Sequence, residues 1–170
     1  QNACTAPHLI IWLGTNKNVN KSQSVFWKKL HNILRNEYEI QPIIAVDKLA
    51  SFYNQSINMS NVKKTETPDN LIWRIKLDKL SNNIDKYKCN SGYFSEFHAN
   101  SIDDIKSIID KSYQTLSYYG ISNKELNKFI KEAKVKGIDR IVPIGRTSEF
   151  SLTWDGYNLI TTLSRVCEII

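Results

Sequence analysis

Short apolar or β-branched runs alternate along this chain with longer stretches in which hydrophobic positions recur every three or four residues. The short runs predict strands, at residues 8–13, 71–77, 93–98, 115–119 and 140–144. The periodic stretches predict helices, at residues 22–38, 44–57, 102–112 and 123–136. This alternation is typical of an α/β fold, with a mostly parallel sheet and flanking helices.

Local signals mark the ends of these elements. Ser101 and Ser122 each precede an acidic residue by three positions, which is the capping-box spacing that predicts a helix start. Gly137 follows the second of these helices and can adopt a positive φ. Residues 61–70 are polar and predict a loop. The chain shows no repeat or linker, so residues 1–170 are expected to form a single domain or a fragment of one.

Composition narrows the class of protein. No apolar run approaches the roughly 20 residues that a membrane-spanning helix needs, and none is expected. The three cysteines, Cys4, Cys89 and Cys167, are odd in number and form no Cys-x-x-Cys pair, which argues against a disulfide scaffold and against a zinc or other metal site. We therefore expect a cytoplasmic protein. Three Asn-x-Ser sequons leave a secreted glycoprotein as an alternative.

The net charge of +6 raises the question of a nucleic-acid partner. Basic residues that bind phosphates are expected to gather in one patch. Here the lysines are spread through helical segments with acids between them, as in Lys106, Asp110 and Lys111. This distribution is typical of solvated helix faces, and we expect no nucleic-acid partner.

Cys4 is the candidate nucleophile. It lies among the small residues Ala3, Thr5 and Ala6, before an apolar run that begins at Leu9. A turn before structured backbone supplies amide donors that lower a thiol pKa and later stabilise an oxyanion. The alternative is an ordinary buried cysteine that acts as a small apolar residue.

His8 follows Cys4 by four residues and is within reach as a base. It also opens the first predicted strand, and a strand residue points by the pleat of the sheet rather than toward a preceding loop. We favour the structural role for His8.

Two separated segments resemble the long-chain acyl-CoA reductases, the fatty-acid reductase component of bacterial bioluminescence systems, which belong to the aldehyde dehydrogenase superfamily. Residues 1–12, QNACTAPHLIIW, resemble the nucleophile segment of that family. Residues 137–146, GIDRIVPIGR, with Phe150 and residues 154–157, are similar to its closing signature. Between the two segments the likeness is only in the order of elements, which implies the catalytic domain fold of aldehyde dehydrogenases.

The resemblance implies an NADPH-dependent enzyme that reduces a fatty acyl-CoA to an aldehyde. In that chemistry Cys4 attacks the acyl carbonyl to give a thioester, and hydride from NADPH releases the aldehyde. No Gly-x-Gly-x-x-Gly motif occurs in the chain, so the family's cofactor region is expected upstream of Gln1. The resemblance further implies a fatty acyl-CoA or an acyl-protein synthetase component as partner, and a homo-oligomer for the full-length protein.

Four more residues are candidates for binding. Phe150 and Trp154 are expected to line an acyl channel, and Arg146 to meet a phosphate of CoA or of the cofactor. Gly92 lies where the superfamily has a Glu-x-Phe-Gly element against the cofactor ribose, although Cys89 falls at the position of its acid. Each also has a structural alternative: core aromatic, surface arginine or turn glycine.

The chain begins at Gln1, without a Met or a signal peptide before it. We expect a piece of a longer enzyme that carries the nucleophile without the hydride source. Purified alone, it should not reduce an acyl-CoA with NADPH, while Cys4 should react slowly with a thiol probe. The alternative from another class is a non-catalytic binding or interaction module with buried structural cysteines.

Overall fold

The computed structural model describes residues 3, 5–65, 67–133 and 137–169. The candidate nucleophile Cys4 lies outside these residues. The chain divides into two compact units, a first unit of residues Gln1–Ile108 and a second unit of residues Ile109–Ile170.

The first unit is built on a four-stranded sheet with the order β1-β4-β3-β2. The strands β1 (Leu9–Leu13), β4 (Tyr93–Ala99) and β3 (Trp73–Leu77) are mutually parallel. Strand β2 (Val62–Thr65) pairs antiparallel with β3 at the margin of the sheet. The expected mixed α/β architecture with a mostly parallel sheet is confirmed for this unit.

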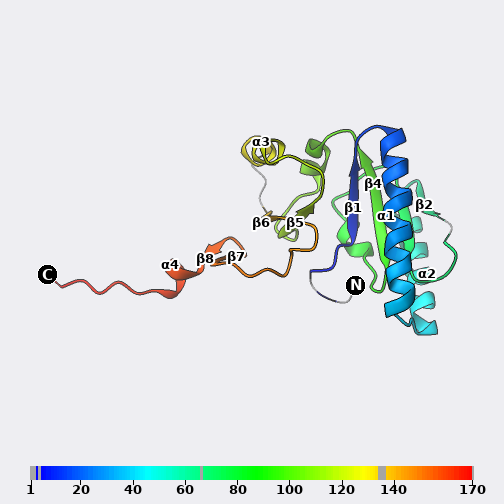
Figure 1. Cartoon of the computed structure of the whole chain (residues 1–170), viewed down its shortest axis with the longest axis horizontal. Helices are drawn as coiled ribbons and strands as arrows, with labels where there is room; N and C mark the ends of the chain where they lie inside the picture. Colours follow the sequence, from blue (N-terminus) through cyan, green and yellow to red (C-terminus); the bar gives the residue numbers. More distant parts are fainter. Residues whose placement is uncertain (1–2, 4, 66, 134–136, 170) are drawn as a thin grey trace. The chain divides into compact units, whose positions relative to one another are not determined.

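Helices α1 (Asn16–Glu37) and α2 (Pro42–Asn58) pack on opposite faces of this sheet (Figure 1). Successive side chains of a strand point to opposite faces, so neighbours on β4 show which helix covers which face. Glu96 meets Trp27 of α1, whereas Ser95 meets Gln55 of α2. An apolar cluster on the α1 side is centred on three buried residues, Trp27, Ile72 and Phe94.

Both long helices start earlier than predicted. Helix α1 begins at Asn16, six residues before the expected start, because the Thr15 side chain accepts a hydrogen bond from the backbone N–H of Asn18. Its first turns are mostly polar and carry no apolar period. Helix α2 begins at Pro42, two residues before the expected start, in the first turn, where the missing N–H of proline costs nothing.

Two short 3₁₀ helices complete the first unit, η1 (Ile84–Tyr87) and η2 (Ile102–Ser107). The capping box at Ser101 is confirmed, since its side chain and that of Asp104 each accept a backbone N–H. The helix predicted over 102–112 is however only this short 3₁₀ segment.

Strand β2 corrects the expectation of a loop over 61–70. Its two central residues, Lys63 and Lys64, are exposed, and Lys64 Nζ lies 3.7 Å from the ring centroid of Trp73. A charged strand at the margin of a sheet is protected against pairing with other chains. Because its central residues are both charged, the segment lacks the alternation of apolar and polar residues from which a strand is predicted.

The second unit contains a parallel pair of strands, β5 (Thr115–Tyr118) and β6 (Arg140–Pro143), connected through helix α3 (Asn123–Ala133). A short hairpin follows, in which β7 (Thr153–Trp154) pairs with β8 (Tyr157–Asn158), and after it comes the short helix α4 (Leu159–Leu163). The strand predictions at 115–119 and 140–144 are thus confirmed to within one residue.

Helix α3 supplies the buried residues of the second unit. Leu126 and Phe129 point inward, and Phe129 is almost completely buried. The predicted capping box is confirmed, because the backbone N–H of Glu125 donates to Ser122 Oγ and the Ser122 backbone N–H donates to the Glu125 carboxylate. Gly137 has a φ of 143°, and a Cβ there would lie 1.8 Å from the backbone oxygen of Asp110.

Candidate functional site

The three parallel strands of the first unit begin at one edge of the sheet, called here the N-terminal edge. The backbone N–H of Ser95 donates to the oxygen of His8, just before β1, at 2.9 Å. The backbone N–H of Trp73 donates to the oxygen of Gly92 at 2.7 Å. His8, which follows the segment around Cys4, and Gly92, the glycine of the predicted cofactor turn, therefore lie at the same edge, although 84 positions separate them in sequence.

Lys48 reaches this edge from α2 and is completely buried. Its Nζ donates to the backbone oxygens of Asn70, at 2.5 Å, and Leu71, at 3.3 Å. Burial lowers the pKa of Lys48 to about 8, with Cys89 and Asp69 acting in the opposite direction. The edge thus contains a buried amine that is partly neutral near pH 8.

Gly92 lies directly against this lysine and the segment before β3. Its φ is +92°, and a Cβ would lie 2.1 Å from the Leu71 oxygen and 3.6 Å from Lys48 Nζ. Real Cβ atoms do not approach a backbone oxygen so closely, so the position requires glycine. The close approach of two backbone segments explains this glycine without a cofactor.

A buried chain of hydrogen bonds continues along the α2 side of β4. The hydroxyl of Tyr93 donates to Gln55 Oε1 at 2.7 Å, and Gln55 Nε2 lies 3.2 Å from Ser95 Oγ. Burial raises the pKa of Tyr93, with a smaller contribution from Cys89. The tyrosine is therefore a neutral hydrogen-bond donor, and it fixes Gln55 between two strand positions.

Cys89 and His8 border the same edge and are both half-buried. Burial and the positive charge of Lys88 lower the pKa of His8, while a backbone hydrogen bond to Cys89 acts in the opposite direction. Cys89 is a free thiol. Among the described neighbours of the candidate nucleophile, Ala6 N–H donates to the Ala3 oxygen at 3.0 Å.

A second polar cluster lies on the α1 side of the sheet and is centred on Glu96, whose exposure is 2%. Its carboxylate accepts from the indole N–H groups of Trp12, at 2.7 Å, and Trp27, at 2.9 Å. Arg74 Nε donates at 2.7 Å and the Gln23 amide at 3.2 Å. Every donor is a nitrogen of the chain itself, so this cluster joins α1 to three strands and presents no group to a ligand.

The second unit brings together the other three predicted residues. Arg146 pairs with Glu149, and its Nε lies 2.7 Å from each carboxylate oxygen. The rings of Phe150 and Trp154 stack with centroids 5.5 Å apart at an angle of 28°. The guanidinium of Arg140 lies 4.2 Å from the centroid of the Trp154 ring. Phe150 is 69% exposed, so the aromatic pair is a surface feature.

Arg146 and Phe150 line one open pocket of about 490 Å³. Its floor is strand β6, and its wall is the segment between β6 and β7. The lining includes Ile141, Val142 and Pro143 together with the charged Asp139. This pocket has the size of a small-molecule site, but its lining is as much charged as apolar.

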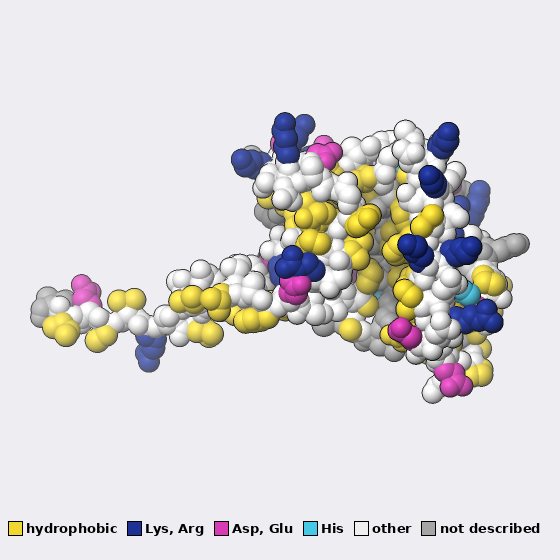
Figure 2. Space-filling view, in the orientation of Figure 1, with side chains coloured by type: hydrophobic (Ala, Val, Ile, Leu, Met, Phe, Trp, Pro, Cys, Tyr) yellow, Lys and Arg dark blue, Asp and Glu magenta, His cyan; other side chains and the backbone are white. Residues whose placement is uncertain are grey.

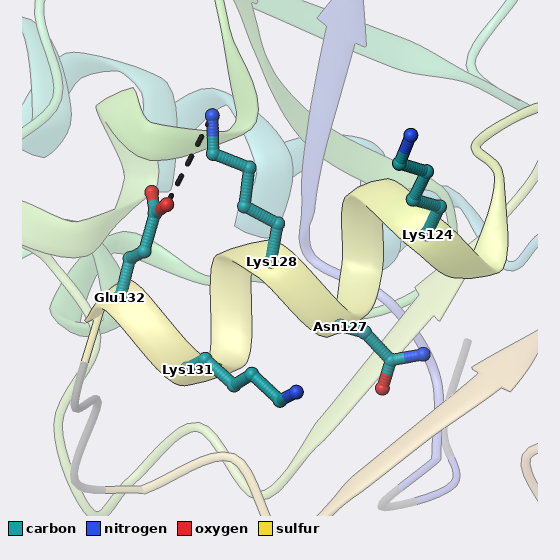
Figure 3. A pocket seen from close by; sticks show the side chains of 5 residues that line it. All are labelled: Lys124, Asn127, Lys128, Lys131 and Glu132. Carbon is teal, nitrogen blue, oxygen red and sulfur yellow. Dashed lines mark ion pairs between the residues drawn. The ribbon is translucent and has the colours of Figure 1, made fainter.

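A second hollow lies along α3 and is lined by lysines (Figure 3). Lys124 and Lys128 extend from one side of the helix and Lys131 from another, while Lys128 lies 3.9 Å from Glu132. The charged groups do not converge on one point. Over the face shown in Figure 2, lysines and arginines are likewise dispersed over several elements.

Comparison with known proteins identifies no relative: no family model, no curated protein and no solved structure matches this chain. In the described part of the chain, no helix is long and apolar enough to cross a membrane. Within the same residues, no group of three or more His, Cys, Asp or Glu side chains is arranged to bind a metal ion.

Sequence reasoning missed the most buried charged residues, Lys48 and Glu96. Lys48 interrupts an otherwise apolar helix pattern, and Glu96 interrupts an apolar strand, so each has the signature of an exposed position. The one available signal was context. Lys48 lies four residues from both Ile44 and Phe52 on the apolar side of its helix, and Glu96 is the one Asp, Glu, Lys or Arg residue among residues 93–99. The partners of both residues come from segments distant in sequence.

Proposed function

We propose that this chain is the nucleophile-bearing catalytic part of an NADPH-dependent acyl-CoA reductase with a fold like that of aldehyde dehydrogenases. Cys4 is the acyl-accepting thiol. The acyl donor is a fatty acyl-CoA or an acyl group delivered by an acyl-protein synthetase component, and the compartment is the cytoplasm. The full-length protein is expected to be a homo-oligomer.

The observation that carries the proposal is the convergence at the N-terminal edge of the first sheet. The segment that follows Cys4 enters β1, and the turn at Gly92 enters β4, its parallel neighbour. Both segments belong to the parts of the sequence on which the resemblance rests. Cys4 itself lies outside the described residues, so the support comes from the position of the segment that follows it.

The chemistry assigned to this chain is acyl transfer. The Cys4 thiolate attacks the thioester carbonyl of the donor, a new carbon–sulfur bond forms, and the CoA thiolate leaves with the electron pair of the old bond. Backbone N–H groups stabilise the tetrahedral oxyanion. One thioester replaces another, so the step needs no oxidant or reductant.

The described residues do not fit NADPH at the turn where it was expected. The space beside the Gly92 Cα is filled by the Leu71 oxygen, and the lysine next to it is engaged by two backbone oxygens. We therefore assign no step of the reduction to these residues. The chain alone is expected to be acylated but not to release aldehyde.

An interaction module is the second candidate, and one observation favours it. Helix α2 presents a row of exposed apolar side chains that includes Val46, Tyr53 and Ile57. An apolar row of this kind is typical of a protein-binding face. The module was expected to have buried structural cysteines, however, and Cys167 is exposed while Cys89 is only half-buried.

The test is acylation of the 170-residue chain with a radiolabelled long-chain acyl-CoA, followed by peptide mapping. We expect hydroxylamine-sensitive label in the peptide that contains Cys4, and loss of that label in Cys4→Ala. The chain supplies two matched controls, Cys89→Ala and Cys167→Ala, which should retain the label.

Label that survives Cys4→Ala, or that moves to Cys167, would refute the assignment of the nucleophile. Aldehyde formation from acyl-CoA and NADPH by the 170-residue chain would refute the separation of acylation from reduction. Stable capture of a protein partner with no acylation would favour the interaction module.

A further inference from the structure

The pocket of the second unit contains an aromatic ring that is supported from behind. Phe150 lines the pocket, is mostly exposed, and stacks nearly parallel on Trp154. Trp154 in turn contacts the guanidinium of Arg140. A ring supported in this way is already oriented, so a planar ligand that stacks on it loses little additional side-chain freedom.

The wall of the pocket is attached to its floor by the same arginine. Arg140 begins β6, and its guanidinium donates to the backbone oxygens of Thr147, at 3.1 Å, and Glu149, at 2.6 Å. These two bonds connect the segment before Phe150 to the strand. The distance between floor and wall is thereby fixed by a side chain that also supports the aromatic stack.

The charges of the lining cancel. Asp139 and Glu149 contribute two carboxylates, and Arg140 and Arg146 contribute two guanidinium groups. A phosphate therefore meets no excess of positive charge, and an alkyl chain would have to desolvate charged groups for which it offers no hydrogen bonds. The lining suits an uncharged planar ring that carries its own donors and acceptors.

We propose that this pocket binds the adenine ring of an adenosine-containing ligand by stacking on Phe150. Adenine is neutral at physiological pH, and it offers an exocyclic amine to the carboxylates and ring nitrogens to the N–H donors of the lining. This proposal changes the role of Phe150 and Trp154 from an acyl channel to a nucleobase platform.

Binding to the 170-residue chain is measured by isothermal titration calorimetry with CoA, adenosine, pantetheine and octanoate as separate probes. We expect heat of binding with CoA and with adenosine, and none with pantetheine, which lacks the base. Octanoate should not compete with adenosine. Binding of pantetheine or octanoate without adenosine would overturn the proposal in favour of an acyl channel.

Substitutions locate the site. Phe150→Ala should weaken binding of adenosine and of CoA by about tenfold or more, the usual loss when a stacking platform is removed. Phe150→Tyr should retain it. Tyr119→Ala removes another exposed aromatic of the second unit, outside the pocket, and should leave binding unchanged. Equal binding by wild type and Phe150→Ala, with unchanged circular dichroism, would overturn the assignment.

NADPH also carries adenine and is titrated in parallel. Binding of NADPH that Phe150→Ala weakens to the same extent as binding of adenosine supports the adenine site. Binding of NADPH without binding of adenosine would overturn it.

Discussion

The two units each contain a glutamate paired with an arginine at 2.7 Å, yet the pairs differ in nearly every other respect. In the first unit Glu96 is buried and receives N–H groups from Arg74, two indoles and an amide. In the second unit Glu149 and Arg146 are both more than half exposed. The two pairs are equally close, but loss of one partner should cost more free energy of unfolding in the buried pair than in the exposed pair.

The same contrast extends to the candidate sites. The N-terminal edge of the first sheet has its polar groups committed to one another, which fixes their geometry. The pocket of the second unit also pairs its charged groups with one another, but it leaves the Phe150 ring mostly exposed. A rigid edge suits a reaction that needs a fixed geometry, and an open pocket with an exposed ring suits recognition of a ligand.

Removal of the buried carboxylate should have the largest effect. Glu96→Ala leaves the Arg74 guanidinium and both indole N–H groups without their acceptor, and should lower the free energy of unfolding by about 3–5 kcal/mol. Urea unfolding followed by circular dichroism measures the change. The matched control is Glu132→Ala on α3, half-exposed, which should change stability by less than about 0.5 kcal/mol. Similar losses for the two variants would contradict the comparison.

Two glycines with positive φ differ in what surrounds them. Gly92→Ala places a Cβ against the Leu71 oxygen in addition to straining the backbone, and should cost about 2–4 kcal/mol. Gly120 has a φ of +75° with no atom near its Cβ position, so Gly120→Ala should cost only the backbone strain, about 1–2 kcal/mol. Thermal unfolding of both variants gives the two values. A larger loss at Gly120 would show that crowding at Gly92 is unimportant.

Lys48 makes the stability of the first unit depend on pH. Its pKa is about 8 in the folded chain and 10.5 ordinarily, so between these values the unfolded chain binds a proton that the folded chain has released. The free energy of unfolding should therefore rise from pH 8 to pH 10.5, by up to about 3 kcal/mol.

Urea midpoints across this range, compared with Lys48→Met, isolate that contribution. The difference between the two pH profiles therefore reports Lys48 together with its charge interactions with neighbouring groups. The variant should lose the rise. If the free energy of unfolding changed with pH in the same way in both proteins, Lys48 would not release its proton between pH 8 and pH 10.5, and the prediction would be wrong.

The exposed pair of the second unit should give the smallest effect. Glu149 raises the pKa of Arg146, and Arg146 lowers that of Glu149, but water solvates both groups. Arg146→Ala should leave the free energy of unfolding nearly unchanged, and any change should shrink in 1 M salt. A salt-independent loss as large as that of Glu96→Ala would remove the distinction between the units.

The sequence predicts the elements of this fold well where local chemistry decides them. The five strand predictions are confirmed, and the caps at Ser101 and Ser122 are confirmed in detail. Prediction from sequence fails where contacts with residues distant in the chain decide the local structure. Strand β2 exists because β3 offers a free margin, and its exposed lysines give no strand signal of their own.

The candidate sites divide in the same way. Phe150, Trp154 and Arg146 are close in sequence, so their proximity in space follows from a short segment and one hairpin. Lys48 belongs to the N-terminal edge only because α2 brings it against Asn70 and Gly92, 22 and 44 positions further along the chain. Periodicity finds the helix but gives no sign of which of its polar residues is buried.

The two indoles on Glu96 make the chain its own spectroscopic probe. Trp12 and Trp27 lie beside one carboxylate and near a guanidinium, and Trp73 is buried in the same unit, whereas the fourth tryptophan, Trp154, belongs to the other. In a Trp154→Phe protein all ultraviolet-excited indole emission therefore originates from the first unit. Its wavelength and intensity then report the opening of that unit alone, and comparison with the unsubstituted chain resolves whether the two units unfold in one step or in two.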